Sequence, residues 1–267
     1  MNCKFAMMVV SCDSYTEVAY TFFKLTEKFM PWMNNIYFVN ETLPLKVNNV
    51  KEIHTGKDLN WSDKVRKALN QIEEEYILFM LEDFFVGKSV SEKTILEAIS
   101  FMEKENIKYY KITAIPKSKR KSKYASYLKS IPSNQRYGIN LQAAIFRKDF
   151  LLEIVSGENR NAWQTETDLL KKVTKKYEYN LEGCVLDNRN IIDIHNGVIK
   201  GKWVPTTIKY FKKIGIDIPL GNRSLMSKWE LFKMNFKRFI SHLLPQGLVK
   251  LIKRLFKKLG FKFVSDN

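Results

Sequence analysis

The hydrophobic pattern of the first half of the chain alternates between strand-like and helix-like segments. Short apolar runs predict strands at residues 5–11, 36–39, 51–54, 76–81 and 109–115. Between them, apolar residues recur at helical spacing and predict helices over residues 16–29, 62–72 and 92–105, the latter two capped by Ser62 and Ser91. This alternation predicts an α/β fold in which a right-handed, largely parallel sheet is flanked by helices.

The second half is less regular. The pattern predicts a strand over residues 141–146 and helices over residues 148–156 and 165–176. Two amphipathic helices are expected near the end of the chain. The first carries apolar residues at helical spacing: Leu225, Trp229, Phe232, Phe236, Phe239 and Leu243. The second, residues 248–259, has a Leu and Ile face opposite five cations.

Composition indicates a folded globular protein, because 45% of the 267 residues are hydrophobic and 13% are aromatic. No apolar run reaches transmembrane length. The N-terminal sequence MNCKFAMMVVSC is too short and too weakly charged for a secretory signal and is interpreted as part of the first strand. Cys3, Cys12 and Cys184 are an odd number of cysteines without metal-type spacing, which predicts reduced thiols and a cytoplasmic protein.

A net charge of +17 indicates an anionic partner such as nucleic acid, anionic lipid or a phosphorylated substrate. Residues 228–267 contain ten basic and two acidic residues, and so carry +8 of that charge. A second basic cluster, PKSKRKSK at residues 116–123, mixes Ser and Lys without an apolar period and is expected to be a mobile loop.

Two adjacent carboxylates, Glu82 and Asp83, end the most apolar run of the chain. A short continuous run of this kind is typical of a strand buried on both faces of a parallel sheet. Ligands bind beyond the carboxyl ends of such strands, where a carboxylate pair can hold a divalent metal and the metal a diphosphate. The alternative is a strand end followed by a solvated acidic turn.

The order of these segments resembles bacterial glycosyltransferases of the GT-A fold, which build capsule and lipopolysaccharide glycans from nucleotide sugars. The resemblance covers residues 9–203. It rests on SCDSYTEVAYTFFKLTEKFMPW, NWSDKVRKALNQIEEEYILFMLEDFFV, YGINLQAAIFRKDFLLEIVSGENRNAWQTETDL and GVIKGKW, in this order. It implies a Rossmann-type nucleotide-binding sheet. We expect residues 1–222 to form the GT-A-like catalytic domain, and the basic amphipathic pattern predicts residues 223–267 to be a helical membrane-association segment.

The resemblance implies two catalytic carboxylates. Asp83 would bind a divalent metal, Mn²⁺ or Mg²⁺, that holds the donor diphosphate, and Glu82 would contact the metal, the ribose or the donor sugar. The family's first acidic position is Leu81 here, which leaves the metal dependence open. In WQTETDLLKK, Glu166 aligns with the catalytic base of inverting enzymes, with Asp168 next to be tested. The alternative for Glu166 is an acid in the first turn of a helix, which it helps to cap.

The remaining site residues are also implied by the resemblance. The nucleotide would contact residues that follow the first strands: Ser11, Asp13, Ser14, Tyr15, Asn40, Glu41, Gly56, Trp61, Asp63 and Lys64. Lys200, Lys202 and Trp203 resemble an element that closes over the diphosphate, and Trp163 and Trp203 are assigned to the acceptor. Asp13 and Ser14 could instead cap the first helix, Trp163 could be a core residue, and His195 could be either a metal ligand or a loop residue.

Four functions remain open. The first is an inverting glycosyltransferase that transfers a sugar from a UDP-sugar to a glycan or lipid-linked acceptor on the inner face of the plasma membrane. The second is a nucleotidyltransferase, although the N-terminal region lacks its Gly-rich phosphate-binding loop. The third is a nucleic-acid-binding protein, which we do not expect, because zinc spacing and RNA-recognition signatures are missing from the sequence. A GT-A-like binding module without turnover is a further alternative.

The C-terminal helices favour an anionic membrane surface as a partner, because their cations alternate with Leu, Ile and Phe at helical spacing. The alternative is that both helices pack on the catalytic domain or mediate contacts within a homo-oligomer.

Overall fold

The computed structural model describes residues 4–114, 117–133, 135, 138–156 and 180–234. The first half contains these elements: β1 (Phe5–Val10), α1 (Thr16–Phe29), β2 (Ile36–Asn40), β3 (Val50–His54), α2 (Trp61–Leu69), β4 (Tyr76–Leu81), β5 (Phe84–Val86), α3 (Glu92–Lys104) and β6 (Tyr109–Lys111). The second half contains these: β7 (Leu128–Pro132), β8 (Ala144–Arg147), α4 (Lys148–Ile154), β9 (Asn180–Asp187), β10 (Ile194–Asn196), β11 (Val198–Ile199), β12 (Lys202–Trp203) and α6 (Pro205–Lys213).

One sheet of eight strands organises the molecule, in the order β3-β2-β1-β4-β8-β6-β9-β7. Strands β3, β2, β1 and β4 are mutually parallel, and β6 is parallel to β9. Strand β8 runs antiparallel to both β4 and β6, and β7 runs antiparallel to β9. The predicted mixed, largely parallel α/β sheet flanked by helices is therefore confirmed.

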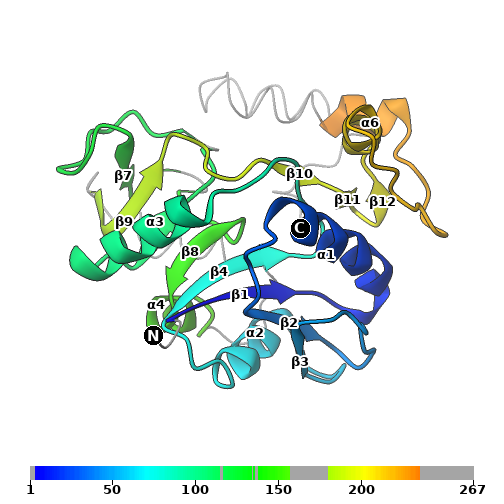
Figure 1. The fold of residues 1–267 in the computed structure, drawn as a ribbon, viewed down its shortest axis with the longest axis horizontal. Helices are drawn as coiled ribbons and strands as arrows, with labels where there is room; N and C mark the ends of the chain where they lie inside the picture. The colour runs from blue at the N-terminus through cyan, green and yellow to red at the C-terminus, as the bar shows by residue number, and fades with distance from the viewer. Residues whose placement is uncertain (1–3, 115–116, 134, 136–137, 157–179, 235–267) are drawn as a thin grey trace, which may run out of the picture.

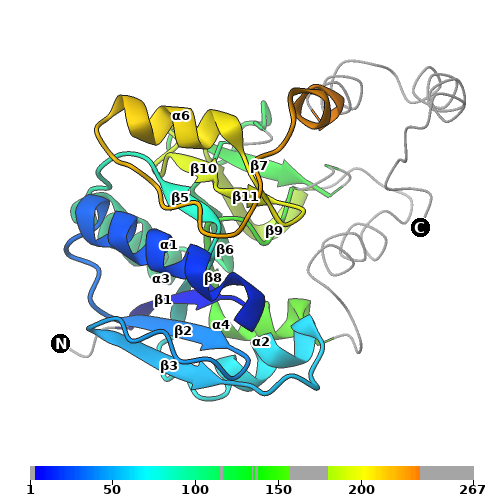
Figure 2. The ribbon, with the colours of Figure 1, turned by 90° about the vertical axis from the view of Figure 1, so that its right-hand side faces the viewer.

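Helices cover both faces of this sheet. Figure 1 shows α1 and α6 above the sheet and α2 and α4 below it, and Figure 2 shows the same layers from the side. The side chains of β1 alternate between two cores, with Met7 and Val9 packing toward α1 and α3, and Met8 and Val10 toward α2 and α4. Burial on both faces explains why β1 and β4 are apolar without alternation.

Local capping differs from the sequence prediction at one helix. Asn60, not Ser62, is the N-cap of α2, because its side-chain oxygen accepts the Asp63 N–H at 3.1 Å. The Ser62 hydroxyl donates to that same oxygen from a buried position. Ser91 caps α3 as predicted, accepting the Thr94 N–H at 3.3 Å.

The basic segment expected to be mobile is hydrogen-bonded along β7. The hydroxyl of Ser118 donates to the Ser130 carbonyl at 2.7 Å, and that of Ser122 to the Leu128 carbonyl at 3.0 Å. The intervening lysines point to solvent. The alternation of Ser and Lys therefore reflects a segment in which Ser118 and Ser122 face the protein and the lysines between them face solvent.

The described residues account for only part of the C-terminal prediction. A helix begins at Lys228, and Trp229 and Phe232 are exposed on its first turns, while residues 235–267 lie outside the described part. Within the described ranges, no helix has the length and apolar character needed to cross a bilayer. Cys12 and Cys184 are free thiols.

Candidate active site

The parallel strands bring several predicted residues to one edge of the sheet. Because β1, β2 and β4 run in the same direction, the loops that follow them meet at their carboxyl ends. These loops carry Ser11, Asn40 and Glu82, all buried, at the ends of their respective strands. The topology of the sheet therefore places these three predicted residues at the same edge.

Glu82 and Asp83 form a largely buried carboxylate pair at this edge. Burial raises the pKa of Glu82 well above its usual range, and repulsion from Asp83 raises it further. Burial also raises the pKa of Asp83 to about 7. Within the described part of the chain, the Oδ1 atom of Asp83 is buried without a hydrogen-bond partner. A cation or a donor would satisfy this oxygen, so the pair is not an ordinary solvated turn.

The backbone of Asp83 is held by the loop after β10. The N–H of Gly197 donates to the Asp83 carbonyl at 2.7 Å. A Cβ atom at Gly197 would lie 2.4 Å from the ring of Phe85, so only glycine allows this approach. The backbone of Asp83 is therefore fixed by the residue that connects β10 to β11.

Tyr15 and Arg223 lie within electrostatic range of the carboxylates. The guanidinium carbon of Arg223 stands 4.2 Å from the centre of the Tyr15 ring. Burial raises the pKa of Tyr15, Arg223 lowers it, and Asp83 and Glu82 raise it again, so all four side chains influence one another. Tyr15 was predicted and Arg223 was not, because no local pattern around Arg223 indicates a site.

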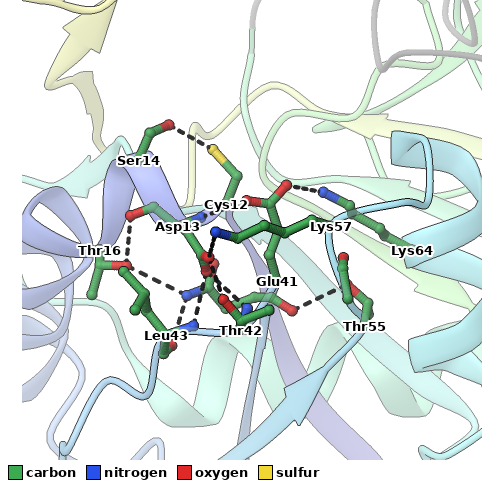
Figure 3. Close-up of polar contacts among 12 residues, drawn as sticks. Cys12, Asp13, Ser14, Thr16, Glu41, Thr42, Leu43, Thr55, Lys57 and Lys64 are labelled. Atoms are coloured by element: carbon green, nitrogen blue, oxygen red, sulfur yellow. Dashed lines mark hydrogen bonds and ion pairs between the residues drawn. The ribbon is translucent and has the colours of Figure 1, made fainter.

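Asp13 supports the neighbouring loop instead of facing an open space. Its carboxylate accepts the N–H groups of Thr42 and Leu43 at 2.8 and 2.9 Å and the Thr42 hydroxyl at 2.6 Å (Figure 3). Desolvation alone would raise the pKa of Asp13, but these hydrogen bonds and Lys57 outweigh it and hold the pKa well below its usual range. Asp13 thus fixes the loop after β2 as an ionised group.

Glu41 and Lys64 form a shielded ion pair next to this loop (Figure 3). The carboxylate of Glu41 also accepts the Asp13 N–H at 3.1 Å. The backbone carbonyl of Glu41 accepts the N–H of Gly56, which follows β3 and has a φ of +87°. The structure therefore brings Asp13, Glu41, Gly56 and Lys64 together as predicted.

Asn40 contributes a second buried oxygen. The Nδ2 group of Asn40 donates to the Leu43 carbonyl at 2.8 Å, whereas its Oδ1 atom is buried with no partner among the described residues. Ser14 is exposed, with its hydroxyl 3.1 Å from the Cys12 sulfur. The edge thus offers both buried and accessible polar groups.

Trp61 and Asp63 have structural contacts at the start of α2. The Trp61 ring packs edge-on against Phe79 with ring centres 6.2 Å apart. Asp63 pairs with Arg66 and with the Asn60 cap. Trp61 therefore packs on β4, and Asp63 stabilises the first turn of α2.

The KGKW segment forms a tight hairpin. Lys200 and Gly201 have φ of +53° and +76° and connect β11 to β12 as a two-residue turn. Lys202 pairs with Glu230 at 2.7 Å. Trp203 is fully buried and its indole N–H donates to the Leu220 carbonyl at 2.7 Å. In this position Trp203 is a packing residue whose ring presents no face to an acceptor sugar.

His195 lies in a separate cluster. Its ring stacks on Tyr210 with centres 3.9 Å apart, and its Nε2 atom is 3.3 Å from Asp193. In the ranges that the structure describes, no three His, Cys, Asp or Glu side chains gather in a metal-binding group. A divalent metal at Glu82 and Asp83 still fits, because Mg²⁺ is usually held by one or two carboxylates, with phosphate and water oxygens completing its shell.

Trp163, Glu166 and Asp168 lie outside the described residues, so their predicted roles stay predictions.

Comparisons with known proteins give only distant similarities. No protein-family model matches the sequence, and no curated protein is significantly similar to it. Residues 1–349 of TarS from Staphylococcus aureus are 13% identical, with a TM-score of 0.42, over 70% of this chain and 59% of that one. The galactosyltransferase LgtC, solved with donor and acceptor sugar analogues, is 9% identical, with a TM-score of 0.36, over 70% and 68%. A cytidylyltransferase from Leptospira borgpetersenii is 12% identical, with a TM-score of 0.42, over 84% and 99%. The chain thus spans about three fifths of the TarS fragment, and these similarities assign it neither a family nor an activity.

Proposed function

We propose that this protein is a glycosyltransferase that transfers a sugar from a nucleotide sugar, a UDP-sugar, to a glycan or lipid-linked acceptor in cell-surface polysaccharide biosynthesis. One observation carries the proposal. The largely buried pair Glu82 and Asp83, one of whose carboxylate oxygens has no hydrogen-bond partner among the described residues, lies at the carboxyl end of β4 beside the loop after β1. In open α/β sheets, nucleotides bind at this edge.

In this mechanism the donor diphosphate lies against Glu82 and Asp83. Asp83 would hold a divalent metal, with Glu82 as the second carboxylate, and the metal would neutralise charge on the departing diphosphate. The loops held by Asp13 and Glu41 would orient the nucleoside, and the charges of Asp83 and Glu82 act on the neighbouring Tyr15. Through that metal, the carboxylate pair would bind the leaving group.

Glu166 is proposed as the general base of a direct displacement with inversion. The acceptor oxygen attacks the anomeric carbon, the bond from that carbon to the diphosphate oxygen breaks, and the acceptor proton passes to the Glu166 carboxylate. The glutamine variant E166Q should keep donor affinity and lose roughly 10²- to 10⁴-fold in transfer rate. A loss smaller than about tenfold would move the base to another residue, with Asp168 tested next, and retention of the anomeric configuration would exclude this mechanism.

Nucleotide binding is the first test. Calorimetry with UDP, CTP and a panel of UDP-sugars, each with Mn²⁺ or Mg²⁺, should show binding of UDP that the D83N substitution weakens strongly. The matched control is D149N, because Asp149 is an exposed aspartate at the opposite edge of the sheet, where it pairs with Arg147. Tight binding of CTP with release of pyrophosphate would support a nucleotidyltransferase instead.

We also propose that the protein is cytoplasmic and associates with the inner face of the plasma membrane through residues 223–267. The supporting features are the +8 charge of residues 228–267 and the exposed rings of Trp229 and Phe232, which are 57% and 52% accessible. Aromatic and cationic side chains on one helix suit the boundary between lipid headgroups and acyl chains.

A further inference from the structure

Arg223 joins two loops that are far apart in the sequence. One of its terminal nitrogens donates to the Ser14 carbonyl, a residue 209 positions away, and the other to the Gly201 carbonyl at 3.3 Å. Its Nε atom lies 2.7 Å from the carboxylate of Glu17, and its plane covers the Tyr15 ring. A single side chain therefore links the loop after β1, the start of α1 and the turn between β11 and β12.

Both terminal nitrogens of the guanidinium donate to backbone carbonyls, whereas its Nε atom lies at ion-pair distance from Glu17 without a hydrogen bond among the described residues. Its side chain is only 14% accessible. A planar fork with donors in fixed directions can serve both carbonyls while its face stacks on an aromatic ring, and a lysine ammonium cannot do both. Arg223 thus acts through the residues it holds and does not need to touch a substrate itself.

The segment that carries Arg223 is anchored on both sides. Before it, the Leu220 carbonyl accepts the Trp203 indole N–H at 2.7 Å, and Gly221 packs so closely on Glu17 that a Cβ atom would lie 2.7 Å from the carboxylate. After it, the Met226 N–H donates to the Trp203 carbonyl at 2.9 Å. Arg223 is therefore presented from a fixed backbone.

The two loops that Arg223 joins border the carboxylate pair. Tyr15 is close enough to Glu82 and Asp83 for their charges to act on it, and the charge of Arg223 acts on Glu82. The Gly201 turn belongs to the hairpin that follows Gly197, whose N–H holds the Asp83 carbonyl. A shift of either loop would therefore move groups that act on the carboxylates or hold their backbone.

We infer that Arg223 is a positioning residue that holds the Ser14–Tyr15 loop against the Lys200–Gly201 turn and so sets the shape of the donor end of the site. This inference rests on the proposed function, in which a nucleotide sugar occupies that end. A displacement of about 1 Å in a binding wall can reduce activity by as much as a hundredfold.

The test compares R223A and R223K with R147A. Arg147 is a matched control because it also pairs with a carboxylate, Asp149, and bonds across to a loop residue, Asn106, but at the opposite edge of the sheet. We expect R223A to weaken UDP binding and to raise the donor KM by about tenfold or more, with a smaller change in kcat. R223K should recover part of the loss and R147A should leave donor affinity unchanged.

Hydrogen exchange separates this inference from the proposed function. In R223A, amides at residues 14–16 and 200–203 should exchange faster than in wild type, while R147A leaves these amides unchanged. If wild type binds UDP and R223A binds it equally well, the inference is wrong and the proposed function stands. If wild type binds no nucleotide, the proposed function fails, and unchanged exchange in R223A would also refute the tie between the two loops.

Discussion

At the scale of single residues, the candidate site is unfavourable for folding, because it buries two adjacent carboxyl groups. Asp83 and Glu82 are adjacent carboxylates in a largely buried position, and one oxygen of Asp83 lacks a partner among the described residues. Buried charges without a partner are rare in structural positions and concentrate at sites of binding or catalysis. Because burial raises the pKa of both groups, it also predicts how the stability of the fold depends on pH.

The substitution D83N should stabilise the protein at alkaline pH. The folded-state pKa of Asp83, about 7, lies above that of an unfolded aspartate, about 4. The folded protein therefore holds the proton more tightly, and stability is lost as pH rises through this window. At about pH 8, D83N should unfold at a higher temperature than wild type, and near about pH 4 the difference should shrink.

Divalent metal should reverse this ranking in thermal unfolding at about pH 8, raising the midpoint of wild type but not of D83N. Without metal, a D83N protein less stable than wild type at that pH would show that the ionised Asp83 carboxylate stabilises the fold. An equal rise of both midpoints on addition of metal would remove Asp83 as a metal ligand.

Cys12 provides a chemical probe of the same edge. Burial raises the pKa of this thiol, the hydrogen bond with Ser14 lowers it, and Glu82 and Glu41 raise it. In a Cys3→Ser background, we expect alkylation at about pH 7 to be slower than that of a free thiol, because less thiolate is present. Saturating UDP with Mn²⁺ should slow it further.

Buried Cys184 is the internal control, because it should react only on unfolding. If nucleotide binds without protecting Cys12 from alkylation, the loop after β1 does not contact the nucleotide.

At the scale of elements, sequence patterns predicted what local chemistry determines. Strands β1, β2, β3 and β4 and helices α1 and α3 appear within one or two residues of their predicted bounds, because apolar spacing and capping residues mark them. The short strands β5 and β10–β12 were not predicted. They have two or three residues each and exist through pairing, as when β5 pairs with β10.

For the candidate site, the sequence likewise predicted the positions that follow from local pattern and missed those that depend on long-range contacts. Residues at the ends of parallel strands, such as Asn40 and Glu82, follow from topology, which a sequence of alternating elements already implies. Arg223 depends on a contact across 209 positions, and the burial of Trp203 depends on the segment that folds over it. Sequence spacing contains no signal for contacts of that kind.

The basic segment at residues 117–123 gives a prediction at this scale. The buried Ser118 hydroxyl donates to the Ser130 carbonyl at 2.7 Å and accepts the Arg120 N–H at 3.2 Å. The substitution S118A should destabilise the protein by about 1–2 kcal/mol, because it removes both hydrogen bonds of the Ser118 hydroxyl. It should also speed trypsin cleavage within residues 117–123.

Exposed Ser126 is the control position, and S126A should cleave at the wild-type rate. Equal cleavage of S118A and wild type would mean that this segment is not held by Ser118.

At the scale of the whole molecule, charge and architecture separate along the chain. The α/β sheet forms one body with helices on both faces (Figure 1), whereas residues 228–267 carry nearly half of the net charge in a small fraction of the length. Charge concentrated in one amphipathic segment favours a surface, not a compact site, as its partner. A tethered enzyme would also meet a lipid-linked acceptor at a high effective concentration.

Truncation after Ser241 tests this arrangement. The removed residues include the five cations and the Leu and Ile face of residues 248–259, and each cation near an anionic leaflet contributes about 1 kcal/mol. We expect the truncated protein to stay in solution when floated with anionic vesicles, while full-length protein moves with them. UDP binding should be equal in both, because the carboxylate pair and Arg223 remain. If the truncated protein floats as well as the full chain, the membrane-binding residues lie outside residues 242–267. The basic segment at residues 117–123 would then be the first to test, by replacing its lysines with neutral residues.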